Sequence, residues 1–259
     1  NYFASSGAMK TGWIKDKDTW YYLDKDGIML TGLQEIDGTR YYLNASGAMQ
    51  IGWKWFDNHY SYFTSSGAMK TGWLKDKDRW YYLKPDDGVM ATGLQEIDGT
   101  RYYLNASGAM QTGWKWLDNH YYYFATSGAM KTGWFQDKDT WYYLDKEGIM
   151  QTGLQEIDGS RYYLNTSGAM ETGWKQLNGN WYYFQADGSL LRNGTTPDGY
   201  KVNQDGIWSL NPDKVEVQGS QEEPKKDSDK PVEKEEKSAE VNEKDEAAET
   251  KPILKADKE

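Results

Sequence analysis

The chain has 259 residues, a net charge of −10, and 13 Trp, 21 Tyr and 6 Phe, yet its mean hydropathy is only −0.93. The absence of cysteine excludes a disulfide scaffold, a thiolate zinc site and a cysteine nucleophile. The acidic charge disfavours nucleic acid as a partner because it repels polyphosphates. The sequence contains no run of about 18 apolar residues, so it predicts no membrane-spanning helix.

The N-terminal residues 1–7 align with residues 61–67, which belong to the second strand of a predicted hairpin. Half a hairpin leaves an unpaired strand edge. We therefore expect the natural polypeptide to extend further in the N-terminal direction.

A Gly-Trp or Gly-Leu dipeptide recurs every 20 residues, with one step of 21 residues caused by an extra residue in the segment 85–88. Repeats of this length are typical of solenoids, in which each unit buries its apolar face against its neighbours. The dipeptides begin at Gly12, Gly32, Gly52, Gly72, Gly93, Gly113, Gly133, Gly153 and Gly173.

Each unit predicts a β-hairpin rich in Trp, Tyr and Thr, which favour strands. Asp37-Gly38 and Asn178-Gly179 are strong two-residue hairpin turns. Other units place weaker turn formers, such as Lys17-Asp18, at the same register. A single hairpin is unstable alone in water, so the prediction is an all-β solenoid of about 20-residue hairpins over residues 1–210.

A longer period is superimposed on the short one, because residues 32–50 and 93–111 are identical. Repeats that begin with Gly-Trp are here called Trp-type, and repeats that begin with Gly-Leu are called Leu-type. One Trp-type repeat stands on each side of every Leu-type repeat, and this pattern recurs every 60 or 61 residues. This period predicts roughly three hairpins per turn of the solenoid.

The predicted register assigns the aromatic rings to two faces of each hairpin. Because side chains alternate along a strand, Trp13, Trp20 and Tyr22 share one face, while Tyr21 and Leu23 share the other. The face with Leu or Phe in every unit is the expected core. Spacing alone leaves open whether the other face packs as ordinary core or forms an aromatic cage for a quaternary ammonium group.

The repeated motifs resemble the choline-binding, or cell-wall-binding, repeats of Gram-positive surface proteins. The resemblance is carried by GWIKDKDTWYYLDKDGIM, GWLKDKDRWYYL, GWFQDKDTWYYLDKEGIM and GWKQLNGNWYYF, and by the closing segment NGTTPDGYKVNQDGIW. It implies a hairpin solenoid that holds phosphocholine of teichoic and lipoteichoic acids. Choline would sit between two Trp residues of one hairpin and a Tyr of the next, often near a Met.

The resemblance, carried over residue by residue, implies four sites with two Trp residues each. These are Trp13, Trp20, Tyr42 and Met29; Trp73, Trp80, Tyr103 and Met90; Trp134, Trp141, Tyr163 and Met150; and Trp174, Trp181 and Tyr200, which has no intervening Met.

The remaining units depart from this pattern. In two of them a Tyr replaces the second Trp and an additional Trp55 or Trp116 is present. Their expected weaker sites are Trp53, Tyr60 and Tyr82, and Trp114, Tyr121 and Tyr143. The Leu-type units place Arg where the second Trp would stand, so we expect no choline there. These arginines are Arg40, Arg101 and Arg161.

No enzyme or metal site is expected in this chain. The acidic pairs, such as Asp16 and Asp18, recur in every similar turn, which turn chemistry explains better than catalysis. The turns lack the ligand spacing of a calcium loop. His59 and His120 occupy equivalent turns and are interpreted as surface residues. No cofactor motif is present.

Residues 211–259 are rich in Glu and Lys and contain no aromatic residue. Such a composition cannot bury enough apolar surface to order itself. We expect a disordered acidic tail or a linker to a further domain.

The sequence therefore predicts an extracellular module that attaches a surface protein non-covalently to the bacterial cell wall through phosphocholine. Two alternatives stay open. One is the wall-targeting part of a murein hydrolase whose catalytic domain lies outside this chain, and the other is a glucan- or glycan-binding array. A host partner or a wall-hydrolase partner is not identified by the sequence.

Overall fold

The computed structural model describes residues 7–208, which form β-strands, turns and corner loops. None of these residues lies in a helix, so none belongs to a helix that could cross a membrane. The fold divides into two compact units, one ending at Gln111 and the other beginning at Thr112. The predictions for the N-terminal residues 1–6 and for the segment 211–259 lie outside the described residues.

Unit 1 contains five antiparallel hairpins, each made of two five-residue strands. They are β1 (Gly12–Asp16) with β2 (Thr19–Leu23), β3 (Gly32–Ile36) with β4 (Thr39–Leu43), β5 (Gly52–Phe56) with β6 (His59–Phe63), β7 (Gly72–Asp76) with β8 (Arg79–Leu83), and β9 (Gly93–Ile97) with β10 (Thr100–Leu104).

Unit 2 contains four more hairpins of the same kind and two short added strands. They are β11 (Gly113–Leu117) with β12 (His120–Phe124), β13 (Gly133–Asp137) with β14 (Thr140–Leu144), β15 (Gly153–Ile157) with β16 (Ser160–Leu164), and β18 (Gly173–Leu177) with β19 (Asn180–Phe184); β17 (Met170–Glu171) pairs with β16, and β20 (Ile207–Trp208) pairs with β19.

Each hairpin closes through a two-residue turn in which both residues have positive φ. At Asp37-Gly38 the φ angles are 51° and 75°, and at Lys17-Asp18 they are 45° and 72°. Positive φ at both positions defines the type I′ turn, whose twist matches that of the flanking strands. The weaker turn formers therefore adopt the same turn as Asp-Gly, and the predicted register is confirmed.

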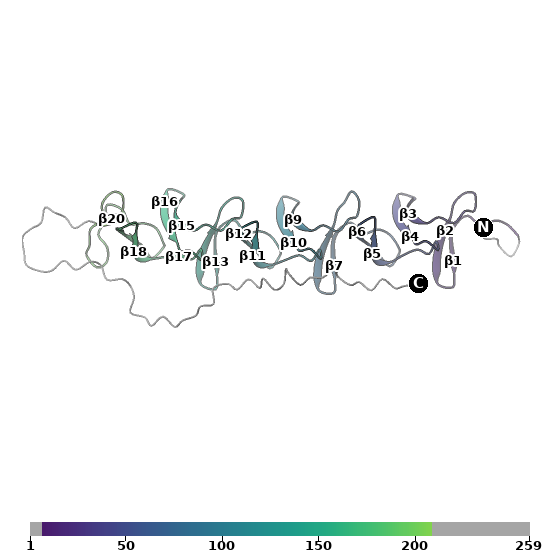
Figure 1. Ribbon diagram of the computed structural model, residues 1–259, viewed down its shortest axis with the longest axis horizontal. Coiled ribbons are helices and arrows are strands. Elements are labelled where there is room, and N and C mark those ends of the chain that lie inside the picture. Colours follow the sequence, from purple (N-terminus) through teal and green to yellow (C-terminus); the bar gives the residue numbers. More distant parts are fainter. Residues whose placement is uncertain (1–6, 209–259) are drawn as a thin grey trace, which may run out of the picture. The chain divides into compact units, whose positions relative to one another are not determined.

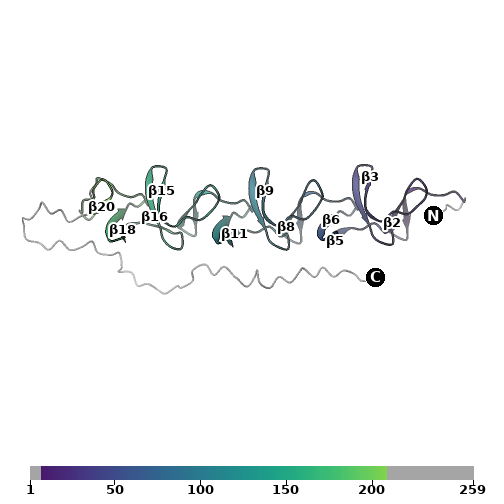
Figure 2. The same cartoon turned by 45° about the horizontal axis from the view of Figure 1, so that its top comes forward.

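The hairpins of each unit follow one another as a solenoid, which confirms the predicted fold class. In unit 1, β3–β4 and β9–β10 are three hairpins apart and project on the same side in both views (Figures 1 and 2). The same holds for β1 and β7 in Figure 1. This arrangement agrees with the predicted three hairpins per turn.

The most deeply buried part of the core in each unit is formed by the last residue of each hairpin's second strand. These residues are almost inaccessible to solvent, and they are the Leu and Phe side chains that the alternation assigns to the core. They are Leu23, Leu43, Phe63, Leu83 and Leu104 in unit 1, and Phe124, Leu144, Leu164 and Phe184 in unit 2.

A methionine and a glycine hold neighbouring corner loops together. Gly47 has a φ of +79°, and a Cβ added there would lie 2.3 Å from the sulfur of Met29 in the preceding corner. The same arrangement joins Met49 to Gly67 and Met69 to Gly88. Glycine is therefore required at these corners both for backbone conformation and for space.

We expect Gly47→Ala to destabilise unit 1 by about 1–2 kcal/mol through the positive-φ penalty, with a smaller added cost for displacing the Met29 side chain, which is flexible and 41% exposed. Gly52→Ala is the matched control, since Gly52 has a φ of +73° but no atom within 4 Å of an added Cβ. It should show the conformational penalty alone. Urea denaturation of both variants measures the difference, and equal losses would contradict a packing role for Met29.

Candidate functional site

Each hairpin has a core-bearing face, which carries the buried Leu or Phe, and an opposite face, here called the outer face. The aromatic rings on the outer face of one hairpin contact the next hairpin in the chain. The Trp13 ring lies 5.2 Å from that of Tyr22, its cross-strand neighbour, and 4.8 Å from that of Tyr41 in β4. Tyr41 alternates with the buried Leu43, so it belongs to the core-bearing face of its own hairpin. The outer face of one hairpin thus meets the core-bearing face of its successor.

Trp13 and Trp20 form two perpendicular walls of an open cage, with ring centroids 6.4 Å apart and an interplanar angle of 88°. Tyr41 provides a third wall at 67° to the Trp13 ring. The Trp20 side chain is 40% exposed, although large aromatic rings normally bury most of their surface. The cage is therefore accessible from solvent.

The two-Trp geometry recurs once more in unit 1, and unit 2 repeats the contact between a Trp and the Tyr of the next hairpin. Trp73 lies 6.3 Å from Trp80 at 88° and 4.9 Å from Tyr102. Trp134 lies 4.8 Å from Tyr162, and Trp141 is 42% exposed.

The expectation that Tyr42 contacts Trp13 is wrong, because Tyr42 stacks on Phe56 and Phe63 of the following hairpin at 4.6 and 6.0 Å. The physical reason is the alternation along the strand, which turns Tyr41 back toward Trp13 and Tyr42 forward. In every open cage the contacting Tyr is therefore one residue earlier than expected. The rings that meet Trp13, Trp53, Trp73, Trp114 and Trp134 are Tyr41, Tyr81, Tyr102, Tyr142 and Tyr162, in place of Tyr42, Tyr82, Tyr103, Tyr143 and Tyr163.

The other tyrosines that the family pattern predicts in the cages occupy different positions in the hairpins. Tyr82 and Tyr143 each lie 5.2 Å from the Trp of their own hairpin, Trp73 and Trp134. Tyr163 packs against Phe184, and Tyr103 lies opposite Leu94 in its hairpin.

The methionine whose backbone adjoins the second Trp of a cage lies one corner loop later than the expected methionine. The Met49 amide, rather than that of Met29, donates to the Trp20 carbonyl at 2.8 Å, and Met110 bonds Trp80 in the same way. Met90 and Met150 instead donate to the carbonyls of Tyr60 and Tyr121. The corner loop beside a cage is therefore the loop that follows the next hairpin in the chain, and not the loop that follows the hairpin of the cage itself. The Met29 sulfur faces Gly47.

The two hairpins that have a Tyr in place of the second Trp form related cages with an added carboxylate. Trp114 lies 6.4 Å from Tyr121 at 89°, which reproduces the geometry of Trp13 and Trp20. The Trp114 indole N–H donates to Asp137 at 3.0 Å. Burial and the negative charge of Asp137 raise the pKa of Tyr142 and of Tyr123 beside it.

Trp53 in unit 1 has the equivalent partners. Its indole N–H donates to Asp76 at 3.0 Å, and its ring lies 4.9 Å from Tyr81. Tyr60 lies directly opposite Trp55 in the hairpin, with ring centroids 4.7 Å apart. Trp55 is 57% exposed, so it adds a solvent-facing ring at the rim.

The fourth two-Trp site is closed by its own neighbours. Trp174 and Trp181 are perpendicular at 6.4 Å, as in the open cages, but they are only 7% and 8% exposed. Val202 packs with them in a buried cluster, against which Tyr200 and Trp208 also lie. The structure brings Trp174, Trp181 and Tyr200 together as predicted, yet as part of a hydrophobic core.

The Leu-type hairpins carry an ion pair at the position of the second cage wall. Arg40 lies opposite Glu35, with 3.8 Å between Nε and Oε2. Arg101 with Glu96 and Arg161 with Glu156 repeat this pair at 3.7 and 3.6 Å. A fixed guanidinium therefore replaces an aromatic ring in these hairpins.

The open cages are suited to a small organic cation. Three aromatic faces attract a cation through their quadrupoles, by about 0.5–2 kcal/mol per contact, and Trp is the most effective ring. A quaternary ammonium group needs no hydrogen-bond partner, which matches walls made of ring faces. Among residues 7–208 no group of three His, Asp or Glu side chains is arranged to hold a metal ion.

Comparisons with known proteins agree with this geometry. A family model described as a choline-binding repeat matches residues 50–92, 91–132, 111–151 and 151–195. A second, described as a putative cell wall binding repeat, matches residues 11–29 and 31–49. A search of curated proteins found no significant match.

Several solved structures from Streptococcus pneumoniae are similar. Choline binding protein F, crystallised in the presence of a peptidoglycan analogue, is 33% identical with a TM-score of 0.64, covering 80% of this chain and 88% of its own. CbpJ is 33% identical with a TM-score of 0.60, covering 77% and 94%. The modular autolysin LytC is 29% identical with a TM-score of 0.57, covering 81% of this chain but 51% of its own.

This chain belongs to the family of choline-binding repeat proteins. The matched family models cover more than half of its length, and the match to CbpJ extends over nearly all of that protein. The fold and the recurring repeats therefore define a binding module of the bacterial cell wall.

Proposed function

We propose that this chain attaches a bacterial surface protein non-covalently to the cell wall by binding the phosphocholine groups of teichoic and lipoteichoic acids. The proposal places the protein outside the cell, on the wall surface, and assigns no catalysis to the chain. The perpendicular Trp13 and Trp20 rings, closed by Tyr41 and open to solvent, are the observation that carries it.

The proposed choline sites are the cages with two Trp walls and the related cages with one Trp and one Tyr wall. Two changes to the expected residues follow from the geometry: the Tyr preceding the expected one completes each cage, and the closed cluster around Trp174 serves as a terminal core without choline. The sites are Trp13, Trp20 and Tyr41; Trp73, Trp80 and Tyr102; Trp134, Trp141 and Tyr162; Trp53, Tyr60 and Tyr81; and Trp114, Tyr121 and Tyr142.

Retention on a diethylaminoethyl-cellulose column, whose groups mimic choline, tests the proposed function. The chain should bind in salt sufficient to suppress simple ion exchange and should elute with free choline. Elution with equal concentrations of sodium chloride and choline would contradict it. Choline should also raise the melting temperature, because a ligand that binds only the folded state stabilises it.

The third wall can be tested by comparing two adjacent tyrosines. Tyr41→Ala should weaken choline binding at the first cage by about 2- to 30-fold, corresponding to one cation–π contact. Tyr42→Ala removes a ring stacked on Phe56 and should lower stability while leaving that affinity unchanged. Choline titration followed at the Trp20 indole N–H resonance measures both effects. A larger affinity loss for Tyr42→Ala than for Tyr41→Ala would contradict Tyr41 as the third wall of the cage.

A second candidate is the wall-targeting part of a murein hydrolase. The similarity to the modular autolysin LytC favours it, because the matched region spans 51% of that protein. Choline attachment is common to both candidates. Release of labelled murein by the full-length protein, but not by this chain, would distinguish the targeting role from simple attachment.

A further inference from the structure

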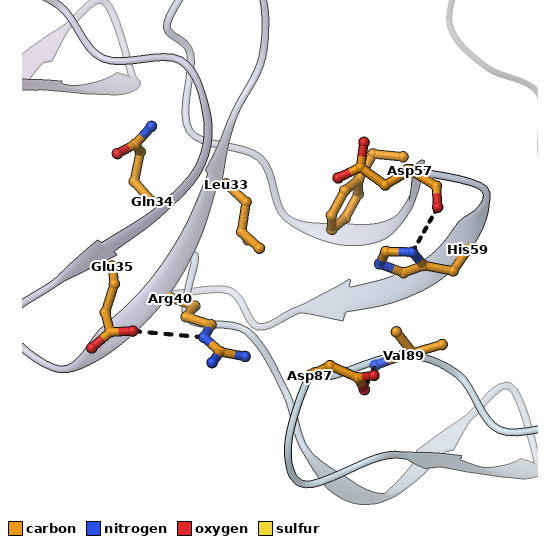
Figure 3. A pocket seen from close by; sticks show the side chains of 9 residues that line it. Leu33, Gln34, Glu35, Arg40, Asp57, His59, Asp87 and Val89 are labelled. Carbon is orange, nitrogen blue, oxygen red and sulfur yellow. Dashed lines mark hydrogen bonds and ion pairs between the residues drawn. The ribbon is translucent and has the colours of Figure 1, made fainter.

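The outer face of the first Leu-type hairpin borders a pocket in place of an aromatic cage. The pocket has a volume of about 580 Å³ and lies within unit 1. This volume falls within the range of about 300–1,000 Å³ that is usual for small-molecule sites. Its lining comes from three successive parts of the chain, namely Leu33, Gln34, Glu35 and Arg40; Phe56, Asp57 and His59; and Asp87 and Val89 (Figure 3).

Two substitutions explain why the cage walls are missing here. Leu33 stands where the Trp-type hairpins have Trp13, and Ser61 stands where the other hairpins have the contacting Tyr. The ring of Phe56 is almost fully buried, so it offers no exposed aromatic face. The pocket therefore lacks the walls that suit a quaternary ammonium group.

Polar groups on opposite sides of the pocket are held in fixed positions. The Arg40 guanidinium is paired with Glu35 through Nε, and its Nη1 donates to the Asp86 carbonyl at 2.8 Å. Asp86 belongs to the corner that contains the extra residue of the 21-residue unit. Arg40 is thereby locked in place beside the pocket and still has further N–H groups, since a guanidinium carries five.

His59 presents a hydrogen-bond acceptor to the same space. Its Nδ1 lies 3.0 Å from the Asp57 carbonyl oxygen, which can only accept, so Nδ1 carries the proton. In the neutral ring Nε2 then has a free lone pair, and it lies on the side of the ring turned toward Leu33 and Arg40 (Figure 3). Arg40 donors and the His59 acceptor are therefore available to one ligand.

The charge of the lining selects among classes of ligand. Glu35 neutralises Arg40, which leaves the carboxylates of Asp57 and Asp87 and disfavours a phosphate or another anion. Donors and acceptors placed around small apolar patches from Leu33 and Val89 match a ring that has hydroxyl groups at its edge and C–H groups on its face.

We propose that this pocket binds a pyranose unit of a neutral glycan, with Arg40 donating to sugar oxygens and His59 Nε2 and the carboxylates accepting from sugar hydroxyls. This inference adds a second ligand to the proposed choline binding and does not depend on it. It assigns a function to the one Leu-type hairpin that faces the lengthened corner.

The chain contains only two histidines, which makes the test direct. Imidazole ¹⁵N labelling gives signals from His59 and His120 alone, and His59→Phe assigns them. Titration with chitotetraose or with isomaltotetraose should shift the His59 Nε2 resonance in a saturable way. The first sugar represents a wall-type N-acetylhexosamine glycan and the second a glucan. Absence of a shift with both sugars would overturn the proposal, as would displacement of the bound sugar by choline.

Matched variants locate the binding site. Arg40→Gln should weaken sugar binding by about tenfold or more, because a hydrogen bond from a charged donor is lost. Arg161→Gln is the control, since Arg161 makes the same ion pair with Glu156 in unit 2. It should leave the His59 titration unchanged, and an equal effect of both variants would overturn the assignment.

Retention on the choline-mimicking column separates this proposal from the proposed function. Arg40→Gln should still be retained, which also confirms that it folds. Asp57→Asn provides a second variant if Arg40→Gln does not fold, and it should likewise weaken the sugar-induced shift. Choline-dependent retention without any sugar response contradicts only the glycan site.

Discussion

Simultaneous replacement of Trp13, Trp73 and Trp134 by alanine is expected to lower retention on a choline-bearing surface by at least about 100-fold. Each of these rings contacts the Tyr wall of the next hairpin, so its loss opens the cage on two sides. Because linked sites raise apparent affinity by about 10²–10⁴ through effective concentration, the loss of three sites exceeds the loss at any one of them.

The control uses the same strand position in the Leu-type hairpins. Leu33, Leu94 and Leu154 are all exposed, and their combined replacement by alanine should leave retention unchanged. Elution by a choline gradient measures both variants, and circular dichroism checks that both are folded. Equal retention of the Trp variant and the wild type would exclude these cages as the main choline sites.

The second large effect concerns the core. Leu43→Ala should lower the free energy of unfolding of unit 1 by about 2–5 kcal/mol, because Leu43 is fully buried and its removal leaves a cavity. Leu33 precedes it in the same hairpin and is 40% exposed. Leu33→Ala should therefore cost only about 1 kcal/mol, which is clearly less than the loss for Leu43→Ala. Urea denaturation followed by circular dichroism compares the two variants, and similar losses would contradict the assignment of Leu43 to the core and of Leu33 to the surface.

The sequence was sufficient to predict the hairpins, their register and their core. The 20-residue period set the spacing, and turn residues such as Asp37-Gly38 set the register that the structure confirms. Alternation then identified Leu23 and its equivalents as buried. These features are local, so they can be read from one repeat.

The partner of each cage could not be read from one repeat, because it depends on how adjacent hairpins face each other. The family pattern indicates a Tyr from the next hairpin and, carried over by position, predicts Tyr42, which lies on the outer face. The alternation already contained the signal for Tyr41, which shares its face with the core residue Leu43. The position of Met49 beside Trp20 depends on the same contact between hairpins.

The burial of the Trp174 and Trp181 rings in unit 2 could not be predicted from a single repeat either. Trp174 and Trp181 repeat the cage motif, but the following segment supplies Val202 and β20 rather than another regular hairpin. Only the three-dimensional arrangement shows that these side chains cover the rings. The buried Trp181 indole N–H lacks a hydrogen-bond partner among the described residues, so burial of this ring leaves one polar group unsatisfied.

The dependence of each hairpin on its successor constrains how such a chain can grow by gene duplication. A copied block of three hairpins reproduces every junction, because the outer face at each boundary meets the same kind of successor as before. A single copied Leu-type hairpin would instead place a Leu, and no Trp ring, against the Tyr of its copy, whereas Trp-type hairpins already follow one another with a Trp–Tyr contact, as at Trp53 and Tyr81. The identity of residues 32–50 and 93–111 is consistent with inheritance in blocks of three.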